Sequence, residues 1–475
     1  MTGFAEYGDY DALGLGELIA RGEVTATEVL EAAVSRLDAV NGEINAVVHD
    51  MREEAERTIE AGLPAGPLSG VPFLLKDLGV LYDGQPTSYG SHLYDGFVAD
   101  HDSTIVARYR AAGLVVFGKT NSPEFGLAAT TEPVRFGPTR NPWDLGRTAG
   151  GSSGGSTAAV AAGVLPAAHA TDGGGSIRIP ASACGLVGLK PTRARNPAGP
   201  DAGEGWSGFS CGHVASRSVR DTAAFLDATH GPEPGAPYHA PAPAGPFLAE
   251  VGTDPERLRV AWSTKAPNGT AVDPDCVRAV EDAAKLLAEL GHEVAEDAPD
   301  FQMADILPHM TLIWAANTWA NTAARYEVLG REPDGDGLEK VTWALANRGR
   351  EAPASGYAKA LQEVHALGRS FARFHQSYDV FVTPTLALPA VPLGNIDMME
   401  PDPDRYIENM LKFMPFTPQI NATGQPAITL PLHQSAGGLP IGVQFIAPFS
   451  DEAALLRLAG QIEAARPWAD QRPPL

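Results

Sequence analysis

The chain has 475 residues, of which 44% are hydrophobic and 20% charged, so it can bury a large globular core. Its formal net charge of −23 at pH 7 argues against nucleic-acid or anionic-membrane partners, because both carry negative charge. Three cysteines without a C-x-x-C pair exclude a disulfide framework and a thiolate metal site. The first residues lack the apolar segment of a signal peptide, so we expect a cytoplasmic protein.

Apolar residues near the N-terminus recur at the three- and four-residue spacing of helices. This spacing predicts helices over residues 12–21 and 25–40. The second helix starts with Thr25 and has Glu28 three positions later, which is the pattern of a capping box. We therefore expect a helical N-terminal segment over about residues 10–60.

Strands and helices alternate through the rest of the chain. We predict strands at residues 70–77, 114–117, 165–170, 380–385 and 441–446, helices at 104–112 and 153–162, and a β-α-β pattern over 258–295. The Pro-, Ala- and Gly-rich residues 231–246 predict a surface loop rather than a domain boundary. Together these elements predict one α/β domain over residues 1–475.

Three consecutive glycines precede Ser176, and this segment carries the strongest indication of function. Gly173, Gly174 and Gly175 leave several backbone N–H groups unhindered and able to converge on one point. Converging N–H donors bind the oxyanion that forms during acyl transfer, and a serine hydroxyl lies beside them. The segment therefore predicts a serine hydrolase.

A second glycine-serine segment, Gly150–Ser156, permits several interpretations. No lysine follows at the spacing of a phosphate-binding loop, and the G-x-G-x-x-G spacing of a dinucleotide site is absent. Gly150–Gly154 matches the nucleophile-elbow pattern G-x-S-x-G, but a polar loop over residues 139–147 precedes it where an elbow requires a strand. A purely structural turn stays open as an alternative.

A serine nucleophile needs a base to activate it. None of the twelve histidines has a recognisable triad context, although His169 lies near the glycines in sequence. Lys76 follows three apolar residues, and burial among them would favour its neutral, basic form. Ser152 could then relay the proton between Lys76 and Ser176. The alternative is that Lys76 only pairs with a carboxylate such as Asp77.

These motifs are similar to those of the amidase signature family. The resemblance covers about residues 10–470 and is carried by Lys76 in its Pro-Phe-Leu-Leu-Lys-Asp context, Gly118–Asn121, Gly150–Ser156, Thr171–Ala181, Gly185–Thr192 and Asn421–Ala427. It implies a single amidase-signature domain, in which helices cover a twisted mixed β-sheet.

The resemblance also implies roles for individual residues. It implies Ser176 as the nucleophile, Ser152 as a bridging serine in a cis peptide arrangement, and Lys76 as the base. The implied oxyanion hole consists of the N–H groups of Gly173, Gly174, Gly175 and Ser176. The implied supporting and substrate-facing residues are Ser153, Asp172, Arg178 and Gly126. Ala170 and Gly173 depart from the residues that are common in the family.

Residues 130–133, 139–143 and 168–172 are most similar to the subgroup with 6-aminohexanoate-cyclic-dimer hydrolases and related acylamidases. The implied reaction is hydrolysis of a small-molecule amide through an acyl-enzyme on Ser176. It needs no metal or organic cofactor, and no H-E-x-x-H motif indicates one. A carbamate or ester hydrolase, a glutaminase-type subunit of an amidotransferase and an inactive binding module stay open, as does a homodimer.

Residues 303–326 carry apolar side chains that are mostly three or four positions apart. Pro308 indicates that a regular helix begins near it. One interpretation is a helix that faces the core. The other is that Trp314 or Trp319 reaches the acyl-binding cleft, since large rings commonly line apolar pockets. We predict Trp314 as a substrate-binding residue.

Overall fold

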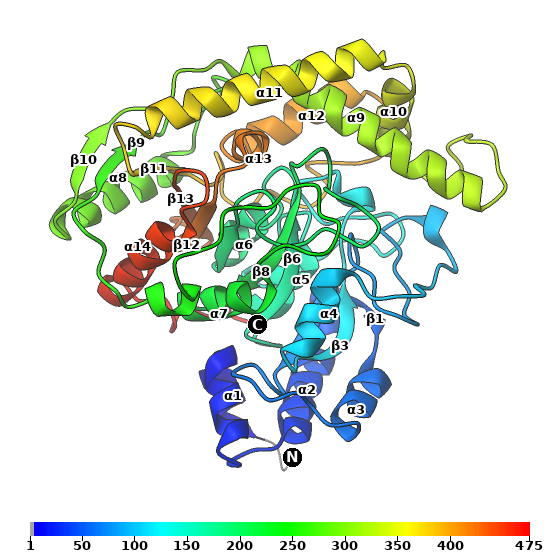
Figure 1. Ribbon diagram of the computed structural model, residues 1–475, viewed down its shortest axis with the longest axis vertical. Helices are drawn as coiled ribbons and strands as arrows, with labels where there is room; N and C mark the ends of the chain where they lie inside the picture. Colours follow the sequence, from blue (N-terminus) through cyan, green and yellow to red (C-terminus); the bar gives the residue numbers. More distant parts are fainter. Residues whose placement is uncertain (1–3) are drawn as a thin grey trace.

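An eight-stranded mixed sheet lies at the centre of the protein, whose computed structural model describes residues 4–475 (Figure 1). The strand order is β10-β9-β11-β13-β12-β7-β8-β6. The strands are β6 (Ala167–Asp172), β7 (Val187–Lys190), β8 (Cys211–Ser216), β9 (Arg259–Trp262), β10 (Glu293–Glu296), β11 (Val380–Pro384), β12 (Ala427–Gln434) and β13 (Pro440–Ile446). The neighbours β10, β9 and β11 run parallel, and the other neighbouring pairs are antiparallel.

A three-stranded sheet with the order β1-β3-β2 lies beside the β6 edge of the large sheet. Its strands are β1 (Val47–Asp50), β2 (Pro72–Lys76) and β3 (Val115–Thr120), and β4 (Arg140–Asn141) and β5 (Asp144–Thr148) form a separate pair. The Lys76 N–H donates to His169 Nδ1 at 3.3 Å, which joins β2 to β6. This contact places the end of β2 near the end of β6.

The N-terminal helices lie at the opposite end of the molecule from the longest helices (Figure 1). They are α1 (Ala12–Ala20), α2 (Ala26–Ile44) and α3 (Arg52–Glu60). The capping box at the start of α2 is confirmed, because the side chains of Thr25 and Glu28 each accept from the other residue's N–H. The strand β1 interrupts the segment that we expected to be helical.

Further helices pack around the large sheet. They are α5 (Gly154–Ala161), α6 (Arg178–Cys184), α7 (Val219–Thr229), α8 (Pro274–Glu289) and α14 (Glu452–Ala465), and α4 (Thr104–Ala111) packs against α7. A second group is α9 (Met303–Val328), α10 (Lys340–Arg350), α11 (Ala354–Phe374), α12 (Pro403–Phe413) and α13 (Pro418–Thr423). Short 3-10 helices cover Ala5–Asp9, His92–Tyr94, Glu124–Gly126 and Phe247–Glu250.

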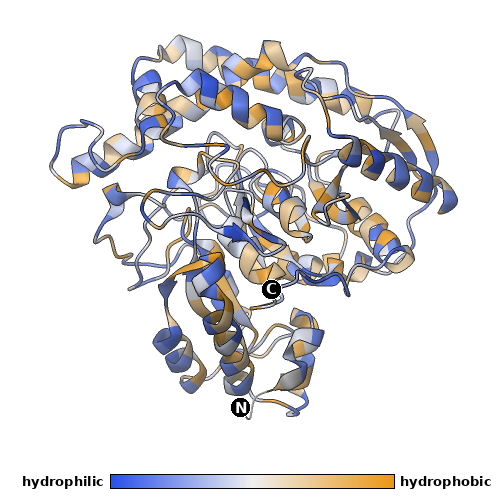
Figure 2. Cartoon of the chain, turned by 180° about the vertical axis from the view of Figure 1, so that it is seen from behind, coloured by the Kyte–Doolittle hydropathy of each residue, from blue (hydrophilic) through white to orange (hydrophobic). Residues whose placement is uncertain are grey.

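Most helices at the surface are amphipathic, and Figure 2 shows hydrophobic and hydrophilic residues interspersed along them. Their apolar faces join four clusters of buried side chains.

The mixed sheet with its surrounding helices confirms the predicted fold class. Within residues 4–475, no helix combines the length and the apolar character that crossing a membrane requires.

The helix α9 begins earlier than the sequence predicted. It starts at Met303, and Pro308 lies inside it rather than at its first turn. A proline within a helix removes only its own N–H donor and crowds the preceding turn. The buried side chains of Met303 and Ile306 pack into an apolar cluster, which stabilises the turns before the proline.

Candidate active site

Lys76 lies at the end of β2 with no exposed surface. Its Nζ donates to Ser152 Oγ at 2.7 Å and to Thr171 Oγ1 at 2.9 Å. Ser152 follows Gly151 through a cis peptide bond, and 2% of it is exposed. The structure therefore brings together two residues that are 76 positions apart and that the sequence predicted to exchange a proton.

Burial disfavours a charged ammonium, and it holds the pKa of Lys76 well below the ordinary value of 10.5. The carboxylate of Asp172 acts in the opposite direction but is the weaker influence. A lysine with a lowered pKa can be neutral near physiological pH and can then accept a proton. The environment of Lys76 is thus suited to a general base.

Asp77 does not pair with Lys76, so the alternative interpretation of this lysine is wrong. The Asp77 carboxylate accepts from the Ser88 N–H at 2.9 Å and lies 3.2 Å from His49 Nε2. Burial lowers the pKa of His169 to about 3, which favours its neutral form. Its Nδ1 accepts the Lys76 N–H, which gives it a structural contact with β2.

The three glycines before Ser176 follow directly after β6. Gly175 has a φ of 129°, a conformation that favours glycine, and a Cβ at this position would collide with Thr417. Its N–H donates to Asp172 Oδ1 at 2.7 Å. The Gly175 N–H is therefore used by Asp172 in this structure, while the oxyanion hole itself stays a prediction. Gly173, Gly174 and Ser176 remain as its expected donors.

Asp172 and Arg178 form a fully buried ion pair that holds the segment around Ser176 in place. Arg178 Nη2 donates to Asp172 Oδ1 at 2.9 Å, and Arg178 Nε donates to Asp172 Oδ2 at 3.0 Å. Burial alone would raise the pKa of Asp172, but Arg178 and hydrogen bonds outweigh it and hold the pKa below its ordinary value. Asn421 Nδ2 also donates to Asp172 Oδ1, at 2.8 Å. These contacts position the two ends of the Asp172–Arg178 turn.

Ser153 connects the two glycine-rich segments through hydrogen bonds to Thr171. Its Oγ donates to the Thr171 carbonyl at 3.2 Å, and the Thr171 N–H lies 3.2 Å from the same Oγ. Ser153 also precedes α5, which is buried along its whole length. The contact therefore anchors the Ser152 segment against the end of β6.

A pocket opens beside Ser176, and it is lined by Gly126, Leu127, Ala128, Ala129, Gly174, Ser176, Ile179, Trp206, Trp314, Leu345, Tyr406, Ile407, Met410 and Met414. None of these described residues carries a charge. Gly126 lies between the pocket and Ser152, because a Cβ on it would lie 3.1 Å from Ser152 Oγ. The predicted nucleophile and both predicted substrate-facing residues therefore share one apolar pocket.

The two candidate tryptophans of α9 differ in their surroundings. Trp314 lines the pocket and also belongs to a buried apolar cluster. The core-facing and the pocket-lining interpretations of α9 therefore both apply to this residue. Its Nε1 is buried without a hydrogen-bond partner among residues 4–475. Trp319 instead lies 5.2 Å from the guanidinium of Arg350 in a cation–π contact. Of the two, Trp314 is the one that faces the pocket.

Sequence reasoning missed several residues of the site. Thr171 and Asn421 were part of the motifs, but neither was assigned a contact, and the structure gives them hydrogen bonds to Lys76 and Asp172. Trp206, Tyr406 and Met410 were not considered at all and line the pocket. No periodic pattern marks Trp206, because it lies in an irregular loop and has a φ of 50°.

Comparison with known proteins agrees with this geometry. The family model described as "Amidase" matches residues 28–456. The 6-aminohexanoate-cyclic-dimer hydrolase of Paenarthrobacter ureafaciens is 40% identical over 478 residues, covering 98% of this chain and 96% of the relative. A solved structure of 6-aminohexanoate cyclic dimer hydrolase has a TM-score of 0.94 at 38% identity, covering 98% of this chain and 99% of that one.

A more distant solved structure, a bacterial aryl acylamidase of the amidase signature enzymes family, has a TM-score of 0.87 at 25% identity. It covers 97% of each chain. The shared fold and these relatives define the protein as a hydrolase that acts on amide bonds. The chain belongs to the amidase signature family. Within residues 4–475, no cluster of three His, Cys, Asp or Glu side chains could hold a metal ion.

Proposed function

We propose that the protein hydrolyses small-molecule amides through an acyl-enzyme on Ser176, with Ser152 and Lys76 as the proton relay. The observation that carries this proposal is the 2.7 Å hydrogen bond between Lys76 Nζ and Ser152 Oγ. Lys76 has no exposed surface there, and Ser176 lines the adjoining pocket. A serine hydroxyl needs such a base before it can attack a carbonyl carbon.

In the first half-reaction, Ser176 Oγ bonds to the carbonyl carbon of the amide. The Ser176 proton moves to Ser152, and the Ser152 proton moves to neutral Lys76. The carbonyl oxygen becomes an oxyanion, which the N–H groups of Gly173, Gly174 and Ser176 stabilise. The C–N bond then breaks as the proton returns from Lys76 through Ser152 to the leaving nitrogen. An amine departs, and an ester on Ser176 remains.

In the second half-reaction, water attacks the ester carbon and gives its proton to Lys76 through Ser152. The bond to Ser176 Oγ breaks, and the proton returns to that oxygen. A carboxylic acid leaves and the free enzyme is restored. Lys76 therefore acts as base and then as acid in both halves, which requires a pKa near the working pH.

The apolar lining supports an uncharged, hydrophobic acyl group as the part of the substrate that enters this pocket. The relatives named for cyclic-dimer hydrolysis support cyclic or linear aminoalkanoyl amides as the first compounds to assay. Anilides, esters and carbamates with one common acyl group should be assayed beside them. Activity of the chain without an added protein would distinguish a free-standing amidase from an amidotransferase subunit.

Trapping the acyl-enzyme tests the proposal directly. Rapid acid quenching during hydrolysis of a p-nitroanilide, followed by peptide mass spectrometry, should find the acyl group on the peptide that contains Ser176. Nitroaniline should appear in a burst if the second half-reaction is the slower one. An acyl group on Ser152, or hydrolysis with no acyl-peptide under conditions that give a burst, would contradict the assignment of the nucleophile.

Trp314→Ala should change the order in which acyl groups are preferred. Because its indole lines the pocket, its removal should shift the ratio of kcat/KM between bulky and short acyl groups by ~1–3 kcal/mol. Trp319→Ala is the matched control, since Trp319 contacts Arg350 and is absent from the pocket lining. An equal loss for every acyl group, accompanied by a lower unfolding temperature, would instead assign Trp314 to the core.

A further inference from the structure

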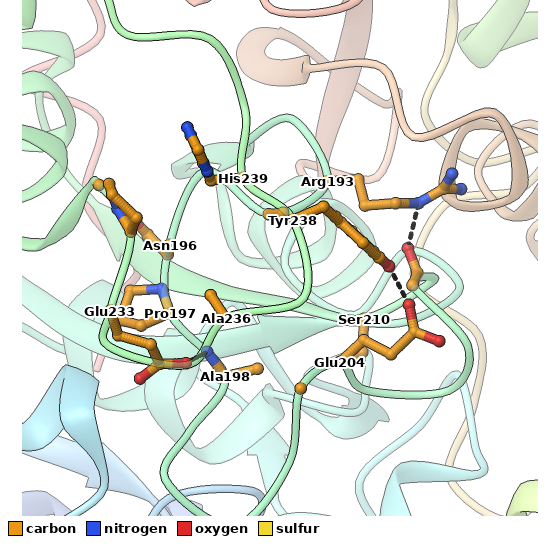
Figure 3. A pocket seen from close by; sticks show the side chains of 15 residues that line it. Arg193, Asn196, Pro197, Ala198, Glu204, Ser210, Glu233, Ala236, Tyr238 and His239 are labelled. Atoms are coloured by element: carbon orange, nitrogen blue, oxygen red, sulfur yellow. Dashed lines mark hydrogen bonds between the residues drawn. The ribbon is translucent and has the colours of Figure 1, made fainter.

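A loop over residues 203–210 separates two cavities. It forms the last part of the connection from β7 to β8, and Trp206 on one side of it lines the Ser176 pocket. Glu204, Gly208 and Ser210 line a second cavity, which is shown in Figure 3. The loop therefore forms part of the lining of both cavities. Its position sets the distance between the Trp206 side chain and Ser176.

The indole of Trp206 occupies the space beside Gly173. A Cβ built on Gly173 would lie 2.9 Å from Trp206 Cε3, which is closer than side chains pack. Trp206 and Ser207 both have positive φ values, 50° and 56°, which residues other than glycine seldom adopt. The loop thus takes an uncommon backbone conformation where it presents the ring to the first glycine of the nucleophile segment.

Contacts on the side of the second cavity hold this loop in place. Arg193 Nε donates to the Gly208 carbonyl at 2.6 Å. The Tyr238 hydroxyl donates to the carboxylate of Glu204, and Figure 3 shows the two side chains pointing toward each other. Arg193 Nη2 also donates to the Ala422 carbonyl at 2.6 Å, which ties the loop to the segment after Asn421.

Contacts on the other side join the same loop to the long helices. Ser207 Oγ accepts from Asn317 Nδ2 of α9 at 3.1 Å, and it also contacts the Tyr357 hydroxyl of α11. The helix α9 carries Trp314, whose Cζ2 would lie 4.0 Å from a Cβ on Gly174. Two indoles therefore flank two consecutive glycines, Trp206 beside Gly173 and Trp314 beside Gly174.

We propose that Trp206 determines acyl specificity by restricting bulk next to the scissile carbonyl, and that Gly173 is the residue that admits its ring. This inference rests on the proposed function, in which Gly173 is an oxyanion donor and therefore adjoins the carbonyl carbon. An unbranched acyl chain passes between the two indoles into the apolar pocket. A chain branched beside the carbonyl, or an aromatic acyl group, meets the Trp206 ring.

The test compares two p-nitroanilides, one with a hexanoyl group and one with a 2,2-dimethyl-branched acyl group. Trp206→Ala should raise kcat/KM for the branched substrate relative to the straight one by about 10–100-fold. Trp206→Phe should shift the ratio in the same direction by a smaller factor. If the alanine variant does not fold, the ratio is measured with the phenylalanine variant instead. Trp319→Ala is the matched tryptophan control and should leave the ratio unchanged.

A double-mutant cycle tests the role of Gly173. Gly173→Ala should lower kcat/KM for both anilides, because the added methyl group displaces the indole toward the substrate. In the double variant with Trp206→Ala, most of that loss should disappear, since the ring is gone. Additive losses in the double variant would overturn this pairing of Gly173 with Trp206.

The acyl-enzyme assay separates failure of this inference from failure of the proposed function. If Trp206→Ala slows both anilides equally while the acyl group is still trapped on Ser176, Trp206 does not determine specificity and the proposed function stands. If the wild-type protein hydrolyses the anilides without acylating Ser176, the proposed function fails, and the inference fails with it.

Discussion

Ser176→Ala should lower kcat for amide hydrolysis by about 10⁴-fold or more and leave the unfolding temperature unchanged. The variant lacks the oxygen that would form the acyl-enzyme, so only the oxyanion hole and substrate binding could still accelerate the reaction. Ser176 is 8% exposed and borders a pocket, so losing one oxygen should leave the packing intact. Initial rates on an anilide and thermal unfolding measure the two effects.

Ser210→Ala is a matched control for this change. Ser210 lies nearby but lines the second cavity rather than the Ser176 pocket, and the substitution removes the same hydroxyl group. It should retain near-normal kcat. A Ser176→Ala protein with normal unfolding and more than a few per cent of the wild-type kcat would assign the nucleophile to another residue.

The parts of the fold that could be predicted depend on contacts between close neighbours in sequence. The capping box at Thr25 and the buried strand before Lys76 follow from side-chain pattern alone, and both are present. The early start of α9 could not be derived in this way. Packing of Met303 and Ile306 against distant parts of the chain outweighs the local effect of Pro308.

The chemistry of the site was predictable in residue type but not in hydrogen-bond partners. The three glycines before Ser176 predicted several N–H groups that are free to bind an oxyanion, yet the Gly175 N–H donates to Asp172. Thr171 reaches Lys76 across 95 positions, and Asn421 reaches Asp172 across 249. Contacts of this range depend on the arrangement of β2, β6 and α13, which local patterns do not encode.

Lys76→Met should lower kcat by ~10³-fold or more, because both half-reactions would lose their proton acceptor. Methionine keeps an unbranched side chain of similar length and an apolar character at a site with no exposed surface, so the fold should be retained. Single-turnover and steady-state rates with one anilide measure the loss, and circular dichroism checks the fold. A variant with near-normal kcat would exclude Lys76 as the base.

The pH dependence identifies the base more specifically. Because burial lowers the pKa of Lys76, kcat/KM should rise with pH as the amine loses its proton, and reach a plateau below the ordinary lysine pKa of 10.5. The unfolded chain holds this proton at pH values where the folded protein has released it. The Lys76 contribution to the free energy of unfolding should therefore also rise with pH in this window and vanish in Lys76→Met.

Lys119 provides the matched control for this pH profile. It is a second buried lysine on the neighbouring strand β3, where burial lowers its pKa to about 8, and its Nζ donates to Thr87 rather than to a serine of the site. Lys119→Met should keep the rising limb of kcat/KM, although it removes another buried lysine whose pKa is lowered. The assignment of Lys76 would be contradicted if the rising limb disappeared in Lys119→Met. It would also be contradicted if the limb persisted in the residual activity of Lys76→Met. In either case another group would be the one whose deprotonation activates Ser176.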